Sequence, residues 1–123
     1  MKHRWIQRLL AGVSILVLLL TMAACGSVEE TDVIGTWRRE TLYMAYYNCE
    51  TDMIATFSED GTFGVVLVNH ENNAPLNMAG GNWTLEENRV LAERGDGAGV
   101  MEFTYNTKKG TLEFEGYPFE KDK

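Results

Sequence analysis

Turn-forming residues recur at short intervals through most of this chain, and their spacing strongly constrains the fold. The runs between them are short and rich in Val, Thr, Tyr and Phe, and none after residue 32 shows helical periodicity. The turn signals are Glu59-Asp60-Gly61, Asn72-Asn73-Ala74-Pro75, Gly80-Gly81-Asn82, Glu87-Asn88, Gly95-Asp96-Gly97 and Lys108-Lys109-Gly110. Short β-rich runs separated by such turns predict an all-β antiparallel meander.

Several of these runs alternate between apolar and polar residues. Met101, Phe103 and Tyr105 share one side of an extended chain, and polar residues occupy the other side. Leu112 and Phe114 repeat the pattern. A period of two predicts half-buried antiparallel strands with one face on a core.

The expected domain covers residues 33–120 and contains seven or eight strands joined by hairpins. Such a row can close into a barrel or fold into a sandwich, and closure removes the exposed sheet edges. We expect a small closed barrel. The predicted strands are 34–44, 51–57, 62–69, 79–85, 89–93, 99–105 and 111–115, with a last one near 117–120.

The N-terminal segment has the organisation of a secretory signal peptide. Residues 1–8 are basic, residues 9–20 are almost entirely apolar, and the small pair Ala23-Ala24 precedes Cys25. The alternative is a transmembrane helix. The apolar stretch is shorter than the roughly 20 residues that span a bilayer, which favours the signal peptide.

The stretch Met22-Ala23-Ala24-Cys25 resembles the lipobox of bacterial lipoproteins. That resemblance implies cleavage of residues 1–24 and acylation of Cys25 with more than one fatty chain. Residues 25–32 would then be the lipidated cysteine and a polar tether. The bilayer would be a partner, and the domain would stand outside the cytoplasm on the cell membrane or the outer membrane.

Net charge narrows the choice of partners. Residues 1–24 hold three of the 11 basic residues and none of the 18 acidic ones, so the remainder has a net charge near −10. Such a domain repels phosphate backbones, which disfavours nucleic acid. It also repels anionic lipid headgroups, so we expect the folded part to stand off the membrane surface.

The strand region also resembles lipocalins and lipocalin-like domains. Gly35-Thr36-Trp37 is similar to their Gly-x-Trp opening. An Asp-Gly-Thr hairpin at Gly61, a second tryptophan strand at Trp83 and a closing hairpin around 110–114 follow in the same order. The resemblance implies structural roles for Gly35, Trp37, Gly61 and Trp83, a barrel fold and, loosely, a binding role.

The densest aromatic cluster is the candidate ligand site. Aromatic side chains at a barrel mouth can grip an apolar ligand or a partner protein. The alternative is that they close one end of the core. The cluster consists of Tyr43, Met44, Tyr46 and Tyr47.

Catalytic and metal-binding patterns are weak. His70-Glu71 offers two ligands, whereas a metal site needs three or four. If Cys25 is lipidated, Cys49 has no disulfide partner and is either a buried residue or a free thiol. If Cys49 lay beside His70, the two could form a nucleophile–base pair. No flanking signature supports this pair, so we expect no catalytic site, metal or cofactor.

Two hypotheses of different classes therefore remain. The first is binding of a small apolar ligand or an envelope component; the second is a protein-interaction or structural envelope domain with a filled core. The volume of the interior separates them, because small barrels are usually filled by their own side chains. The large residues expected to converge there are Phe57, Phe63, Leu67, Trp83, Met101, Phe103, Leu112 and Phe114.

Overall fold

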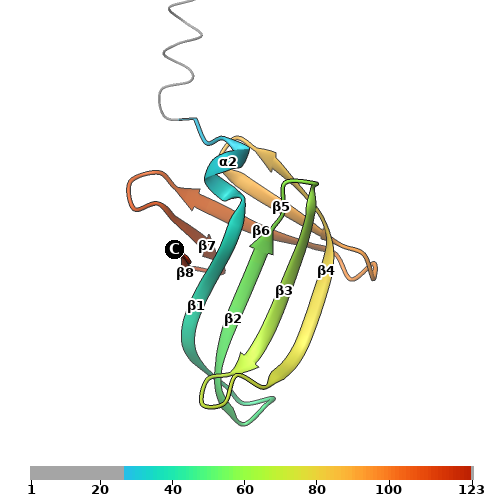
Figure 1. The fold of residues 1–123 in the computed structure, drawn as a ribbon, viewed down its shortest axis with the longest axis vertical. Coiled ribbons are helices and arrows are strands. Elements are labelled where there is room, and N and C mark those ends of the chain that lie inside the picture. The colour runs from blue at the N-terminus through green and yellow to red at the C-terminus, as the bar shows by residue number, and fades with distance from the viewer. Residues whose placement is uncertain (1–26, 123) are drawn as a thin grey trace, which may run out of the picture.

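The computed structural model describes residues 27–122 and shows one antiparallel barrel of eight strands. Each strand pairs with the next in sequence, and β8 pairs back onto β1, so the predicted barrel is confirmed and the sandwich alternative is wrong (Figure 1). The elements are α2 (Glu30–Val33), β1 (Gly35–Met44), β2 (Cys49–Phe57), β3 (Thr62–Asn69), β4 (Pro75–Glu86), β5 (Arg89–Arg94), β6 (Val100–Asn106), β7 (Thr111–Phe114) and β8 (Tyr117–Lys121).

The expected signal peptide and the expected acylation of Cys25 lie outside the described residues. Within residues 27–122, no helix is both long enough and apolar enough to cross a bilayer.

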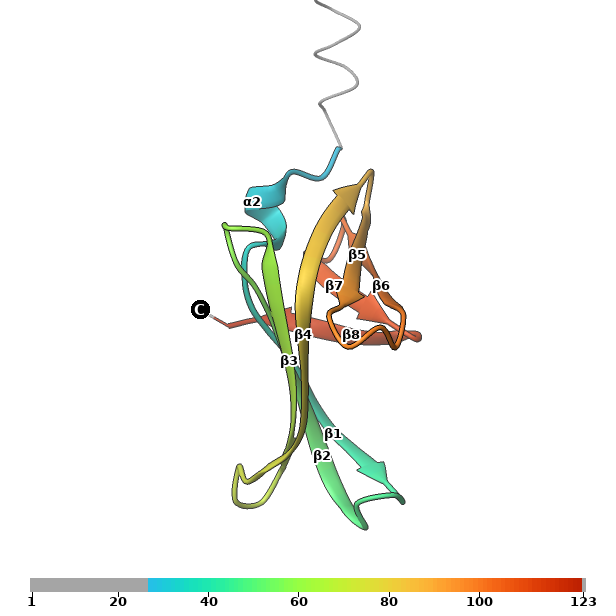
Figure 2. The ribbon, with the colours of Figure 1, turned by 90° about the vertical axis from the view of Figure 1, so that its right-hand side faces the viewer.

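The strands differ in length, and this difference leaves one end of the barrel open. β4 has 12 residues, whereas β7 has four. The β1–β2 and β3–β4 hairpins run on past the shorter strands and diverge below them (Figure 2). Within residues 27–122, β8 pairs with β1 only at Trp37 and Arg38, so the second half of β1 has no strand partner on that side in the described part of the chain.

Two strands begin at least two residues earlier than the sequence predicts, whereas the other strand bounds agree to within one residue. β4 begins at Pro75 rather than residue 79, and β2 begins at Cys49 rather than residue 51. Proline and asparagine weaken a strand pattern, but Pro75 is the first strand residue, where no ladder hydrogen bond is lost. The loop before it is therefore shorter than the turn residues suggest.

The segment expected to be a polar tether contributes to the domain. Glu30–Val33 forms one helical turn, closed by reciprocal hydrogen bonds between Glu29 and Asp32. Val28 is buried and Val33 is fully buried in the core. The carbonyl of Val33 accepts a hydrogen bond of 2.8 Å from Trp37 Nε1. Apolar residues in a mostly acidic stretch thus close the upper end of the barrel.

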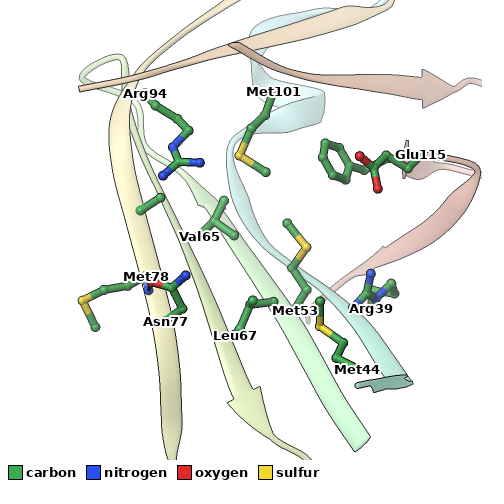
Figure 3. A pocket seen from close by; sticks show the side chains of 12 residues that line it. Arg39, Met44, Met53, Val65, Leu67, Asn77, Met78, Arg94, Met101 and Glu115 are labelled. Atoms are coloured by element: carbon green, nitrogen blue, oxygen red, sulfur yellow. Dashed lines mark hydrogen bonds between the residues drawn. The ribbon is translucent and has the colours of Figure 1, made fainter. Parts of the chain in front are cut away.

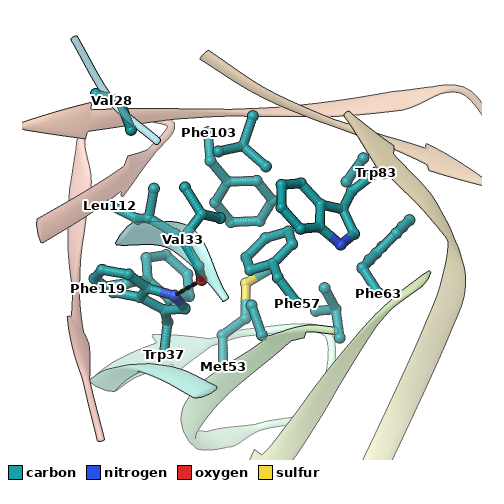
Figure 4. Packing of buried hydrophobic residues seen from close by; sticks show 14 residues of the cluster. Val28, Val33, Trp37, Met53, Phe57, Phe63, Trp83, Phe103, Leu112 and Phe119 are labelled. Carbon is teal, nitrogen blue, oxygen red and sulfur yellow. Dashed lines mark hydrogen bonds between the residues drawn. The ribbon is translucent and has the colours of Figure 1, made fainter. Parts of the chain in front are cut away.

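Aromatic side chains fill the end of the barrel next to α2. The ring of Phe57 lies edge-on to Trp83 and Phe103, with centroids 5.6 and 5.4 Å apart (Figure 4). Phe103 also contacts Phe119 edge-on at 5.8 Å. Trp37 is 1% exposed and Trp83 6%, so both lie in the core.

Gly35 and Gly61 both occupy backbone positions that other residues adopt only with strain. Gly35 has φ 138° and Gly61 has φ 87°. A Cβ atom on Gly35 would also lie 2.7 Å from Cε of Lys121. Gly61 turns the β2–β3 hairpin, and its carbonyl accepts a hydrogen bond of 2.9 Å from the backbone N–H of Trp83. Glycine adopts both conformations at low cost, and the structural roles that the resemblance implies for the two residues remain predictions.

Candidate functional site

The interior of the barrel has a filled end and a hollow end. Below the aromatic core lies a cavity of about 220 Å³ that opens between the long hairpins (Figure 3). Its wall is mainly apolar. The apolar side chains that line it are Met44, Met53, Val65, Leu67, Met78, Ala79, Met101 and Phe114.

The alternation of β2 and β3 explains where the cavity begins. Phe57 and Phe63 are direct cross-strand partners on the inner face near the filled end. Toward the other end, the inward pair becomes Met53 and Leu67. Flexible and aliphatic side chains replace rings as the hairpins diverge, so they no longer fill the space between the walls. The sequence placed Leu67, Met101 and Phe114 inside the barrel and left open whether they fill it; in the structure they pack against the core and border this cavity.

Arg39 is the polar residue that sequence analysis missed. It lies two residues after Trp37 on β1 and faces inward, with 9% of its surface exposed. Its Nε and Nη2 atoms are buried and have no hydrogen-bond partner among residues 27–122. Burial lowers the pKa of Arg39 from its ordinary value, and the charges of nearby groups, including Glu115, act in the opposite direction.

Two further charged side chains border the cavity. Arg94 ends β5, donates to Asp96 Oδ2 over 2.6 Å, and keeps a buried Nε without a partner in the described part of the chain. Glu115 lies in the turn between β7 and β8 and is exposed. The cavity thus carries two cations and one anion in a strongly acidic protein.

The predicted aromatic cluster does not form one site. Tyr43 is 58% exposed and Tyr46 88%, so these rings do not close the core. Tyr46 contacts Tyr47 edge-on at 4.9 Å, and Tyr43 Oη donates to Asn48 Oδ1 over 2.6 Å. Only Met44 of the four lines the cavity. The tyrosines lie at the β1–β2 turn, and ligand binding by them remains a prediction.

His70 lies beside a buried aspartate rather than Cys49. Asp52 has a side chain 3% exposed and lies on the outer face of β2, 2.9 Å from Nδ1 of His70. It also accepts hydrogen bonds of 3.0 Å from Arg38 and from the backbone N–H of Thr41. Burial acts to raise the pKa of Asp52, but these hydrogen bonds and charges outweigh it and lower the pKa.

No candidate metal site is present in the described part of the chain, where no group of three or more His, Cys, Asp or Glu residues could hold an ion. Cys49 Sγ lies 3.8 Å from Thr51 Oγ1.

Sequence analysis gave no reason to single out Asp52, because it is one acid among many and its burial depends on a bulge in the neighbouring strand.

Comparison with known proteins agrees with this architecture. A family model described as a lipocalin-like domain matches residues 33–114. No curated protein and no solved structure matches the chain. The matched range runs from the start of the barrel through β7 and includes every strand that borders the cavity.

Proposed function

Because the chain belongs to the family of lipocalin-like domains, we propose that its barrel binds a small, largely apolar ligand in the cavity and catalyses no reaction. The observation that carries the proposal is the division of the interior into a filled aromatic end and a hollow end. A barrel that served only as a rigid support would gain stability from filling this space, since empty volume forfeits packing.

The cavity wall suits an adaptable apolar site. Met44, Met53 and Met101 reach it from three different strands. Methionine is flexible and polarisable and adjusts to ligands of different shape. A volume of about 220 Å³ is below the range of roughly 300–1,000 Å³ typical for drug-sized ligands, so we expect a small one.

A protein-interaction role is the second candidate, and one observation favours it. Ile54, Val66 and Met78 are cross-strand partners in one row on the outer face of β2, β3 and β4. Met78 is 70% exposed. An apolar row of this kind is a possible contact surface for an envelope protein.

We also propose that acylated Cys25 anchors the domain on the outer side of a bacterial membrane. The lipobox resemblance supports this proposal. The first described residues lie at the α2 end, opposite the diverging hairpins (Figure 1). An anchor just before them would hold α2 toward the bilayer and leave the cavity facing away from it.

Methyl NMR of the full-length protein, labelled at its methionine methyl groups and held in zwitterionic lipid nanodiscs, tests cavity binding. The probe is hexanamide, a small neutral amphiphile, and empty nanodiscs measure its partitioning into lipid. We expect the methyl signals of Met44, Met53 and Met101 to shift in a saturable way. Met78 lies at the edge of the cavity, but it is 70% exposed and points away from the other lining side chains in Figure 3, so its methyl signal should shift least.

Shifts confined to Met78, or no saturable shift at millimolar probe, would reject a cavity ligand site. Shifts confined to Met78 would favour the outer apolar row as the functional surface.

A further inference from the structure

The mainly apolar cavity contains a desolvated cation that lacks an acceptor. Arg39 is 9% exposed, and its Nε and Nη2 atoms have no partner among residues 27–122. Its Cζ lies 5.7 Å from the ring centroid of Tyr117 and 5.9 Å from that of Phe119. These rings offset part of the lost hydration, but they accept no conventional hydrogen bond from the N–H groups.

The two unpaired nitrogens define the geometry of the missing acceptor. Nε and Nη2 lie on the same edge of the guanidinium plane, with N–H bonds that run nearly parallel. Such an edge matches the two oxygens of a carboxylate, each oxygen accepting one hydrogen bond. A single acceptor atom, or a cation, would leave the edge unsatisfied.

The charges around the cavity favour an anion. Arg94 already donates to Asp96, and in the described structure no ion pair joins Glu115 to Arg39 or Arg94. Arg39 is therefore the arginine at the cavity that forms no ion pair with the described residues, although Glu115 and Asp52 lie near enough to act on its pKa. The rest of the protein is acidic and repels anions, so an anionic ligand needs a local cation without an ion-pair partner, which Arg39 provides.

We propose that the cavity takes an anionic amphiphile whose carboxylate binds the Nε–Nη2 edge of Arg39 and whose short alkyl chain lies against the methionines. Figure 3 shows Arg39 next to Met44 and Met53 at one side of the cavity and Arg94 at the other. This inference rests on the proposed cavity-binding function and names its ligand class.

The same methyl NMR titration tests it with three probes that share a six-carbon chain. Hexanoate and hexanamide have nearly the same shape and differ in charge; hexylamine carries the opposite charge at pH 7. Because hydrogen bonds between charged groups are stronger than those to a neutral amide, we expect hexanoate to bind at least about 10-fold more tightly than hexanamide. Hexylamine should bind most weakly.

The variant Arg39→Met keeps an unbranched side chain of similar length and removes the charge. Hexanoate should then bind no more tightly than hexanamide, while hexanamide affinity changes little. Arg89→Gln is the matched control, because it removes one positive charge from an exposed site on β5. It should preserve the preference for hexanoate.

Equal affinities of hexanoate and hexanamide for the unmodified protein would overturn this inference and leave cavity binding intact. Tightest binding of hexylamine would also overturn it and point to Glu115 as the partner of the headgroup. Saturable binding of none of the probes would overturn cavity binding itself, and this inference with it. The ranking with unmodified protein decides the matter even if Arg39→Met fails to fold.

Discussion

The carboxylate of Asp52 lies 2.9 Å from Nδ1 of His70, and its other oxygen accepts from Arg38 on β1. The backbone N–H of Thr41, which also donates to Asp52, belongs to the irregularity in β1 between Arg39 and Leu42. Thr41 has φ 50°, an unusual value for a β-branched residue. Asp52 therefore holds the bulge that immediately follows Arg39 on the cavity wall.

This arrangement predicts loss of stability in acid. The pKa of Asp52 is lowered in the fold, so its contribution is present above the unfolded pKa of about 3.9 and is lost as pH falls through the folded pKa. At pH 7, Asp52→Asn should lower the free energy of unfolding by roughly 1–3 kcal/mol. Urea denaturation from pH 3 to 7 measures both effects.

The difference between unmodified protein and Asp52→Asn should shrink toward pH 3. Glu59→Gln, at an exposed turn, is the control and should have little effect at any pH. If Asp52→Asn lowered the free energy of unfolding equally at every pH, the charge of Asp52 would contribute nothing to stability.

Two alanines that flank Val65 allow a matched test of the cavity. Val65 pairs with Ala55 on one side and Ala79 on the other, but only Ala79 lines the cavity. Ala79→Leu should fill space, weaken hexanamide binding several-fold and cost little stability. Ala55→Leu should destabilise by roughly 1–3 kcal/mol, because Ala55 is fully buried in packed core. Equal losses of stability in Ala79→Leu and Ala55→Leu would contradict the conclusion that one end of the barrel is hollow.

The tyrosines at the β1–β2 turn should contribute little to cavity binding. Tyr46 is 88% exposed and does not line the cavity, whereas Met44, two residues earlier, does. Tyr46→Ala should leave the hexanamide affinity within about two-fold of the original, and Met44→Ala should weaken it, because Met44 presents its side chain to the ligand. The NMR titration compares them, and a larger effect of Tyr46→Ala would favour the aromatic cluster as the site.

Membrane anchoring depends on one cysteine. Cys25→Ser should abolish incorporation of labelled palmitate in a bacterial host. The variant should also no longer be found as a lipidated protein in the membrane fraction, because stable anchoring requires acyl chains. Cys49→Ser is the matched control and should still be labelled. Labelling that survives Cys25→Ser would refute the lipobox interpretation.

Local sequence determined where the strands lie in the chain and which of their side chains point into the barrel. The alternation of Met101, Phe103 and Tyr105 is enough to define a strand and its inner side, because successive side chains point to opposite faces. Gly61 identified a hairpin, since its backbone conformation requires little more than local information. The resemblance around Trp37 and Trp83 identified the barrel family, which the family model confirms.

Only the tertiary structure decided how much of the interior is filled. The alternation around Leu67 and Met101 predicts that their side chains point into the barrel. It does not predict whether aromatic rings or empty space lie opposite them. That depends on the unequal strand lengths and on the point where β1 leaves β8, just before Arg39. For the same reason Arg39 reads as an ordinary strand arginine in the sequence: whether a guanidinium is buried without an acceptor is set by residues from distant strands, which no local pattern specifies.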